Sequence, residues 1–270
     1  MVLSENIFCR SPFLKKTIDA TARLFLTFYG DTVDLLRITP GNNNTITYPL
    51  SRRASIKDII ESLGVPHTEI GKILLDGHEQ TFNKIAQDNE HYQVFPLSPD
   101  ILPTVATALR PEPLVTCHFL VDINVRRLAG LLRMAGLNTE DVGLDSANIA
   151  TVEKAIDQER ILLTRSRDLL KQSRLVFGHL VRSQNPEQQL KEIINLYDLH
   201  NQLHPFSRCI ACNGLLIKVA KETIIDRLLP LTKKYYHQFS QCTDCSKVYW
   251  HGSHHDKMAA QLDRILARSL

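Results

Sequence analysis

Four cysteines near the C-terminal end of the sequence have the spacing of metal ligands. Cys209 and Cys212 form one C-x-x-C pair, Cys242 and Cys245 form a second, and twenty-nine residues separate the two pairs. Each pair can form a tight turn, and two such turns supply the four soft ligands of a zinc tetrahedron. Because four sulfur ligands leave no open position for a substrate, we expect one structural zinc ion. The alternatives are unconnected free cysteines or a redox site, although thioredoxin-like sites use a single C-x-x-C pair.

Aromatic and histidine side chains follow the second cysteine pair. Tyr249 and Trp250 could stack on a nucleobase, or they could pack over a small zinc module that needs apolar cover. His251, His254 and His255 could ligate a second metal or contact phosphate, or they could form an ordinary polar surface. The sequence leaves these alternatives open.

Acidic residues near predicted strand ends form a second candidate site. Asp122 ends an apolar stretch, Asp168 lies just beyond a later one, and Asp145 lies in the polar segment between them. Ligands of open parallel sheets bind at the carboxyl ends of the strands, and carboxylate oxygens suit Mg²⁺ or Mn²⁺. An ion held there could activate water and stabilise the leaving oxygen of a phosphodiester. The alternatives are that Asp122 caps the following helix and that the other acids are solvated.

Arginines lie near the same strand ends in the sequence. Arg126 and Arg165 are the candidates for contact with phosphate, because the planar guanidinium group matches phosphate geometry. The alternative is a set of surface salt bridges with the neighbouring acids, and each of these contributes little stability.

Hydrophobic periodicity and turn signals predict the elements that position these residues. Residues 1–22 show no such pattern and are interpreted as an N-terminal arm. A helix begins after Ser55, which can cap it with Asp58 three residues on, and Gly64 can end it. The order of strand, strand, helix, strand, strand predicts a small α+β domain of the β-grasp, ubiquitin-like type over residues 23–98. The predicted strands are 23–29, 46–50, 73–75 and 92–95.

The sequence pattern after residue 98 predicts a linker, a second domain and a C-terminal module. Residues 99–114 contain four prolines and are interpreted as a Pro-rich linker. Residues 115–204 alternate strands and helices, which predicts an α/β domain with a parallel sheet covered on both faces. We place the zinc ribbon at 205–260 and a C-terminal tail at 261–270. The predicted elements of the α/β domain are strands 118–122 and 160–164 and helices 125–136, 147–158 and 188–200.

The composition indicates a globular protein whose charge is unevenly divided. Hydrophobic residues make up 43% of the 270 residues, and the net charge is +3. Residues 23–104 carry seven basic and ten acidic side chains, whereas residues 205–270 carry ten basic and five acidic ones. An acidic front and a basic tail suggest different partners for the two ends, and a basic module with aromatic residues suits nucleic acid.

The sequence also predicts a location. No apolar run approaches the roughly 18 to 20 residues of a membrane helix, and the N-terminal residues show no signal-peptide pattern. Doubled C-x-x-C pairs indicate metal in a reducing compartment in place of disulfides. We therefore expect a cytoplasmic protein that makes no membrane contact.

Several of these segments together resemble the Mut-seven C-terminal RNase family. In the α/β region the matching stretches are FLVD (119–122), RLA (127–129), LRMAG (132–136) and RILLTR (160–165). In the cysteine region they are RCIACNGL (208–215), CTDC (242–245) and VYWHGSH (248–254). The N-terminal part resembles the ubiquitin-like domain that often precedes this family, through SIKDIIESLGVPHTE (55–69).

The resemblance implies a metal-dependent endoribonuclease of PIN-like fold, with a C-terminal zinc ribbon and with Asp122 as the first catalytic carboxylate. The family typically has an Asp where this chain has Ser166, and it commonly has one near Asn138. Asp168 could substitute if its loop reorients, and Asp145 could match an acid in the intervening segment. Loss of carboxylates would weaken metal binding, because ligand charge helps set affinity.

These implications lead to competing functions. The first, which we favour from the sequence, is RNA processing or decay, in which Mg²⁺ or Mn²⁺ assists phosphodiester hydrolysis. The alternative, for which Ser166 argues, is a catalytically silent RNA- or ribosome-binding factor on the same fold. The RNA partner in either case could be tRNA, mRNA or the ribosome. A third is a scaffold that binds a protein partner through the acidic β-grasp domain. This domain runs into the linker without a free Gly-Gly end, so we expect it to dock partners or orient RNA.

Overall fold

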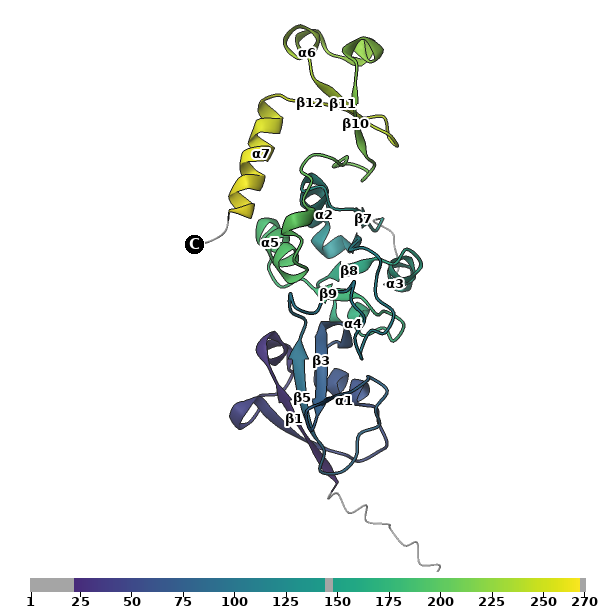
Figure 1. Cartoon of the computed structure of the whole chain (residues 1–270), viewed down its shortest axis with the longest axis vertical. Coiled ribbons are helices and arrows are strands. Elements are labelled where there is room, and N and C mark those ends of the chain that lie inside the picture. Colours follow the sequence, from purple (N-terminus) through teal and green to yellow (C-terminus); the bar gives the residue numbers. More distant parts are fainter. Residues whose placement is uncertain (1–21, 144–147, 268–270) are drawn as a thin grey trace, which may run out of the picture.

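The computed structural model describes residues 22–143 and 148–267. Three parts follow one another along its longest axis (Figure 1). A β-grasp domain lies at one end, a parallel-sheet domain in the middle and the cysteine module at the other end. This arrangement confirms the predicted fold class, with a four-cysteine module that is compatible with a zinc ribbon. Asp145 and residues 1–21 of the expected N-terminal arm lie outside the described residues.

Five strands form the mixed sheet of the β-grasp domain in the order β2-β1-β5-β3-β4, in which β1 and β5 are parallel. Helix α1 (Ile56–Ser62) begins as expected, because Ser55 Oγ accepts a hydrogen bond from the Asp58 amide. Asp76 and Gly77 both have positive φ and form the two-residue turn between β3 and β4. The strands are β1 (Arg23–Phe28), β2 (Thr45–Pro49), β3 (Ile70–Leu75), β4 (His78–Glu79) and β5 (His91–Pro96), with 3-10 helices η1 (Gly30–Leu35), η2 (Asn42–Asn44) and η3 (His67–Glu69).

Four short parallel strands form the sheet of the middle domain in the order β7-β6-β8-β9. The central strands β6 and β8 coincide with the two predicted apolar runs. Neither edge strand was predicted: β7 lies in the polar segment between those two runs, and β9 lies beyond the second run. The strands are β6 (Phe119–Val121), β7 (Thr139–Asp141), β8 (Ile161–Thr164) and β9 (Gly178–Leu180). The helices are α2 (Arg126–Met134), α3 (Asn148–Asp157), α4 (Arg167–Leu170) and α5 (Pro186–Leu196), with 3-10 helices η4 (Ile123–Val125) and η5 (His200–Gln202).

Helices cover both faces of this sheet, as predicted, and each face has its own core. Leu120 and Leu162 lie in a core with residues of α3 and α4, and this core continues into the interior of the β-grasp domain. Phe119 and Val121 lie in the other core, with residues of α2 and α5. Neighbouring residues of β6 point to opposite faces because side chains alternate along a strand. The β-grasp and middle domains therefore share one continuous hydrophobic core.

The segment predicted as a Pro-rich linker packs against both of these domains. Leu109 is buried in the core that the two domains share, and Leu114 is buried in the core on the opposite face of the sheet. The buried guanidinium group of Arg110 donates hydrogen bonds to the carbonyl oxygens of Ile70 and Thr68, at 2.8 and 3.0 Å. Burial lowers the pKa of Arg110 to about 10, so its side chain is charged at neutral pH.

Buried ion pairs also join the β-grasp domain to strand β9. The Glu69 carboxylate, 3% exposed, accepts a hydrogen bond from the Leu180 amide at 2.7 Å. It also lies 3.3 Å from His179 Nδ1 and 3.7 Å from Arg182 Nη2. Burial alone would lower the pKa of His179, but the neighbouring Glu69 carboxylate and a hydrogen bond to Glu192 raise the pKa to about 9. At neutral pH, a charged histidine therefore faces a charged glutamate across this interface.

The cysteine module is built on an antiparallel sheet in the order β10-β11-β12. Its own buried core is small and consists of Ile224, Leu228 and Phe239. Helix α7 (Ser253–Leu266) leaves the module and runs back beside α5 (Figure 1), so the boundary expected at residue 260 falls inside a helix. The remaining elements are β10 (Leu216–Val219), β11 (Phe239–Cys242), β12 (Val248–Trp250), α6 (Pro230–Tyr235), η6 (Lys221–Thr223) and η7 (Ile225–Arg227). Within the described ranges, no helix has the length and apolarity that a membrane span requires.

Candidate functional site

The fold brings the four predicted cysteines together. Their sulfur atoms all lie within 4.8 Å of one another. Cys209 Sγ is 3.6 Å from Cys245 Sγ, and Cys212 Sγ is 3.4 Å from Cys242 Sγ. These separations suit four ligands around one ion, because zinc–sulfur bonds are about 2.3 Å long and tetrahedrally arranged. The group could therefore hold a metal such as zinc.

Each cysteine pair folds into the same tight turn. In the first turn, the Cys209 amide donates to the Gly214 carbonyl oxygen, and the Asn213 amide donates to the Cys209 carbonyl oxygen. The second turn repeats both of these bonds, starting from Cys242. Asn213 and Ser246, the residues that follow the two pairs, both have positive φ, which asparagine tolerates better than most residues. The backbone of both turns is thus fixed by local hydrogen bonds.

Two buried side chains attach the first turn to the middle domain. Asn213 Oδ1 accepts from the Thr139 amide at 2.9 Å, and Asn213 Nδ2 donates to Asn138 Oδ1 at 2.8 Å. The Arg133 guanidinium donates to both carbonyl oxygens between the first two cysteines, at 3.2 Å each. Asn138, near which the resemblance implies an acid, therefore serves as a docking contact at the amino end of β7. Sequence reasoning did not single out Asn213 or Arg133 for this role.

The aromatic and histidine residues after the second pair divide into two groups. The Tyr249 hydroxyl lies 3.0 Å from Cys209 Sγ, so this ring packs over the cysteine group. Trp250 is 38% exposed. The rings of His251 and His255 stack on each other at 4.1 Å. Within the described residues, the four cysteines are the one group of three or more possible ligands, and it includes no histidine.

Asp122 lies at the carboxyl end of β6, as expected, and is 6% exposed. Its Oδ1 accepts a hydrogen bond from the Ile123 amide at 2.7 Å. Its Oδ2 accepts from the Thr164 hydroxyl and from Asn124 Nδ2, both at 2.6 Å. Asp122 is also the N-cap residue of η4, which is the helix-capping role that the sequence offered as an alternative to metal binding. Thr164 and Asn124 were missed from the sequence, although each is a polar residue at or just beyond a strand end.

The two other predicted acids are placed differently. Asp168 is exposed in the first turn of α4, and Asp145 lies outside the described residues. Ser166 is linked to Asp122 through Thr164. The Ser166 amide donates to Thr164 Oγ1 at 3.0 Å, and that hydroxyl in turn donates to Asp122. The Ser166 hydroxyl caps α4 by accepting from the Leu169 amide at 3.4 Å. The catalytic roles of these residues stay predictions.

The two candidate arginines both lie on the surface. Arg126 is exposed at the first position of α2. Arg165 is also exposed, and its guanidinium donates to the carbonyl oxygens of Arg182 and Ser183 at 3.4 and 2.8 Å. Contact of either residue with phosphate stays a prediction.

Among the described residues, the side chains around Asp122 do not make up a complete site for a Mg²⁺ or Mn²⁺ ion. Such an ion takes several oxygen ligands, and carboxylates supply much of the charge that holds it. In the described part of the chain, no group of three or more histidine, cysteine or acidic side chains includes Asp122. Both oxygens of its carboxylate are bound by N–H or O–H donors of the protein. At the position beyond β8 where the resemblance implies a second acid, this chain has Ser166.

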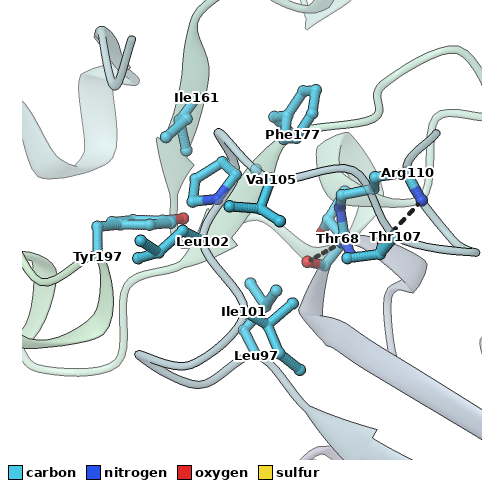
Figure 2. A pocket seen from close by; sticks show the side chains of 12 residues that line it. Thr68, Leu97, Ile101, Leu102, Val105, Thr107, Arg110, Ile161, Phe177 and Tyr197 are labelled. Carbon is cyan, nitrogen blue, oxygen red and sulfur yellow. Dashed lines mark hydrogen bonds between the residues drawn. The ribbon is translucent and has the colours of Figure 1, made fainter. Parts of the chain in front are cut away.

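A small cavity of about 20 Å³ lies at the opposite edge of the sheet, near the amino ends of β8 and β9 (Figure 2). Figure 2 shows Thr68 and Arg110 on one side of it and Ile161 and Tyr197 on another. A space of this size has room for about one water molecule. It belongs to the packing between the linker and the two domains and cannot admit a substrate.

The fold and the cysteine group define a protein with a β-grasp domain, a parallel-sheet α/β domain and a four-cysteine module. The chain belongs to the Mut7-C RNase family. The family model of the Mut7-C RNAse domain matches residues 117–262, more than half of the chain, and that of the Mut7-C ubiquitin domain matches residues 22–101. These matches confirm the family and the domain order that the resemblance indicated. Searches of curated proteins and of solved structures find no match.

Proposed function

We propose that this protein binds RNA and holds it without hydrolysing it. The observation that carries the proposal is the environment of Asp122, whose carboxylate accepts three hydrogen bonds from protein donors. These bonds use three of the roughly four lone-pair positions of the carboxylate and already stabilise its charge, and Ser166 brings no second carboxylate. Membership of an RNase family and the basic C-terminal region support RNA as the ligand.

The same proposal assigns zinc to the cysteine group. Four thiolates in two rigid turns are the preferred donors for a closed structural zinc site. The ion would hold the basic module in its folded form and take no part in chemistry. Cytoplasmic location, the absence of membrane contact, the kind of RNA and a protein partner of the β-grasp domain stay predictions.

The affinity for RNA tests whether an ion at Asp122 contributes to binding. We expect a fluorescent single-stranded RNA to bind with the same affinity, within about twofold, with Mg²⁺ and without it at constant ionic strength. Asp122→Asn is expected to show the same insensitivity of RNA affinity to Mg²⁺, because in the proposal no ion bridges Asp122 and the RNA. This variant loses about 1–3 kcal/mol of stability through mispaired hydrogen bonds, so its folding is checked by circular dichroism.

Asp168→Asn is the matched control, since it removes one negative charge from an exposed position of α4. Tighter binding in Mg²⁺ that Asp122→Asn abolishes and Asp168→Asn retains would show an ion at Asp122. Such a result would refute the proposal and favour the nuclease.

Metal-dependent RNA hydrolysis is the second candidate function, and one observation favours it. Asp122 lies at the carboxyl edge of a parallel sheet, between β7 and β8, where such folds place their ligands. In this candidate, Asp122 would ligate Mg²⁺ or Mn²⁺ with Asp145 and Asp168 as partners, and Arg126 and Arg165 would contact phosphate.

A further inference from the structure

Trp250 occupies an unusual position on the cysteine module. It is the only tryptophan in the chain and the last residue of β12. The Tyr236 ring packs beside it, with ring centroids 6.3 Å apart at an angle of 45°. Its neighbour Tyr249 points to Cys209 instead. The module therefore holds the indole in place while more than a third of the side chain stays open to solvent.

A surface hollow of about 240 Å³ lies beside Trp250. It is formed between β12 and the segment that leads from η7 into α6. Leu228 and Val248 contribute apolar walls, and Arg227 and Lys247 contribute positive charge. The described residues that line the hollow include no acid. Pockets for drug-sized ligands measure roughly 300–1,000 Å³, so this smaller hollow suits a single planar ring.

The metal centre and the hollow are built from the same turn. Arg227 donates a hydrogen bond to the carbonyl oxygen of Ser246, the residue that follows the second cysteine pair, and Lys247 comes next in the chain. Arg227 is therefore anchored beside the hollow, and the Lys247 ammonium lies 5.9 Å from the centroid of the Tyr249 ring. An aromatic ring next to cations is the arrangement that suits single-stranded nucleic acids, because bases stack on the ring while phosphates contact the cations.

The surface around the hollow extends the same pattern. Exposed apolar side chains follow the hollow into α6, where lysines accompany them. An acidic peptide could also use apolar and basic groups, but it would not need a planar, partly open indole. The surrounding side chains are Leu229, Leu231, Lys233, Lys234 and Tyr235.

We infer that this hollow is a stacking site for one unpaired base of single-stranded RNA, an inference that rests on the proposed RNA-binding function. The base lies on the indole of Trp250, and the flanking phosphates contact Arg227 and Lys247. Because a paired base is not free to stack on a side chain, the site selects unstructured RNA over duplex.

The fluorescence of Trp250 tests the inference directly, since no other tryptophan contributes to the signal. The zinc-loaded full chain is titrated with a labelled unstructured oligonucleotide such as U12, and the anisotropy of the RNA is recorded in the same samples. We expect Trp250 fluorescence to fall with the same midpoint at which the anisotropy rises. A hairpin of similar length is expected to bind more weakly and to quench less.

Variants separate stacking from folding. Trp250→Ala is expected to weaken binding roughly 5- to 150-fold, as expected for the loss of about 1–3 kcal/mol of stacking, whereas Trp250→Phe retains most of the affinity. Binding constants fall as salt rises, so the slope of log K against log salt is negative. Arg227→Gln is expected to make this slope less steep by about 0.7. Tyr29→Ala is the control, because Tyr29 is a similarly exposed aromatic residue, 36% exposed, in the β-grasp domain. Each variant is checked for one zinc ion per chain.

The outcomes distinguish the inference from the proposed function. RNA binding without a change in Trp250 fluorescence, together with wild-type affinity for Trp250→Ala, would overturn the inference and leave the proposed function intact. Absence of RNA binding by the wild-type protein at low salt would overturn both. Quenching by a poly-glutamate peptide but not by RNA would assign the hollow to a protein partner and would also overturn the inference.

Discussion

Replacement of Cys242 by serine is expected to abolish metal binding and to unfold the cysteine module. The module buries only Ile224, Leu228 and Phe239 in its own core, which is too little to stabilise it alone. Structural zinc sites supply about 10–16 kcal/mol of binding free energy, and that energy is available only to the folded form. We expect zinc content to fall from one ion per chain to none and protease cleavage to appear within residues 205–250.

Cys117→Ser is the matched control for this prediction. Cys117 is half-buried against the core of the middle domain and belongs to neither cysteine pair. Its replacement is expected to leave the zinc content at one ion per chain. The β-grasp and middle domains pack around the two larger cores, which are separate from that of the cysteine module, so they should stay folded in Cys242→Ser. Full zinc content in Cys242→Ser would contradict the assignment of the site.

Glu69→Gln is expected to destabilise the contact between the β-grasp and middle domains by about 3–5 kcal/mol. The substitution keeps the shape of the side chain but removes the charge that faces His179 and Arg182. The buried His179 and the half-buried Arg182 then lose the carboxylate that both of them face. Thermal unfolding at pH 6 measures the effect. Glu79→Gln, at an exposed position of β4, is the control and is expected to change stability by less than about 0.5 kcal/mol.

The same ion pair predicts how stability depends on pH. Folding raises the pKa of His179 from 6.5 to about 9, so its contribution is complete below pH 6.5 and is lost as pH rises through 9. Burial alone would raise the pKa of Glu69, but His179 lowers it below 4.5, so its contribution is present above pH 4.5 and is lost in more acidic solution. The wild-type protein should lose stability between pH 6.5 and 9, and Glu69→Gln should show a much weaker decline. Equal pH profiles for both proteins would refute this account.

The sequence predicted those features that depend on residues close together in the chain. The cysteine turns need ligands three residues apart, and the cap of α1 needs Ser55 and an amide three residues on. Strands β6 and β8 are short apolar runs and were found by their composition. Strand β9, with the sequence Gly-His-Leu, has no alternating or uniformly apolar pattern, and hydrogen bonds to β8 define it.

Contacts between distant residues could not be predicted in this way. Asn213 and Asn138 are 75 residues apart, and Glu69 and Leu180 are 111 residues apart. Arg110 lies in the segment whose prolines indicated a linker, yet its guanidinium group is buried between the domains. The side chains of Asn213, Glu69 and Arg110 form hydrogen bonds with backbone groups that are distant in the sequence and lie near them only in the folded chain.

Helix α7 was missed although the sequence contains a signal for it. Met258, Leu262 and Ile265 recur at helical spacing and face the core of the middle domain. The residues around Asp122 show the reverse case, because the sequence identified the acid but not its hydrogen-bond donors. Whether an acid at a strand end is a metal ligand or a capped carboxylate depends on those donors.

Incubation of labelled RNA with excess protein in Mg²⁺ or Mn²⁺ tests the central claim most directly. The zinc-loaded wild-type protein and Asp122→Asn are compared, and each sample is split to measure the fraction of RNA bound and the length of the RNA recovered. The account predicts that both proteins bind the RNA and that all of it is recovered at full length. Shortened RNA with the wild-type protein and intact RNA with Asp122→Asn would contradict the account and establish a metal-dependent nuclease.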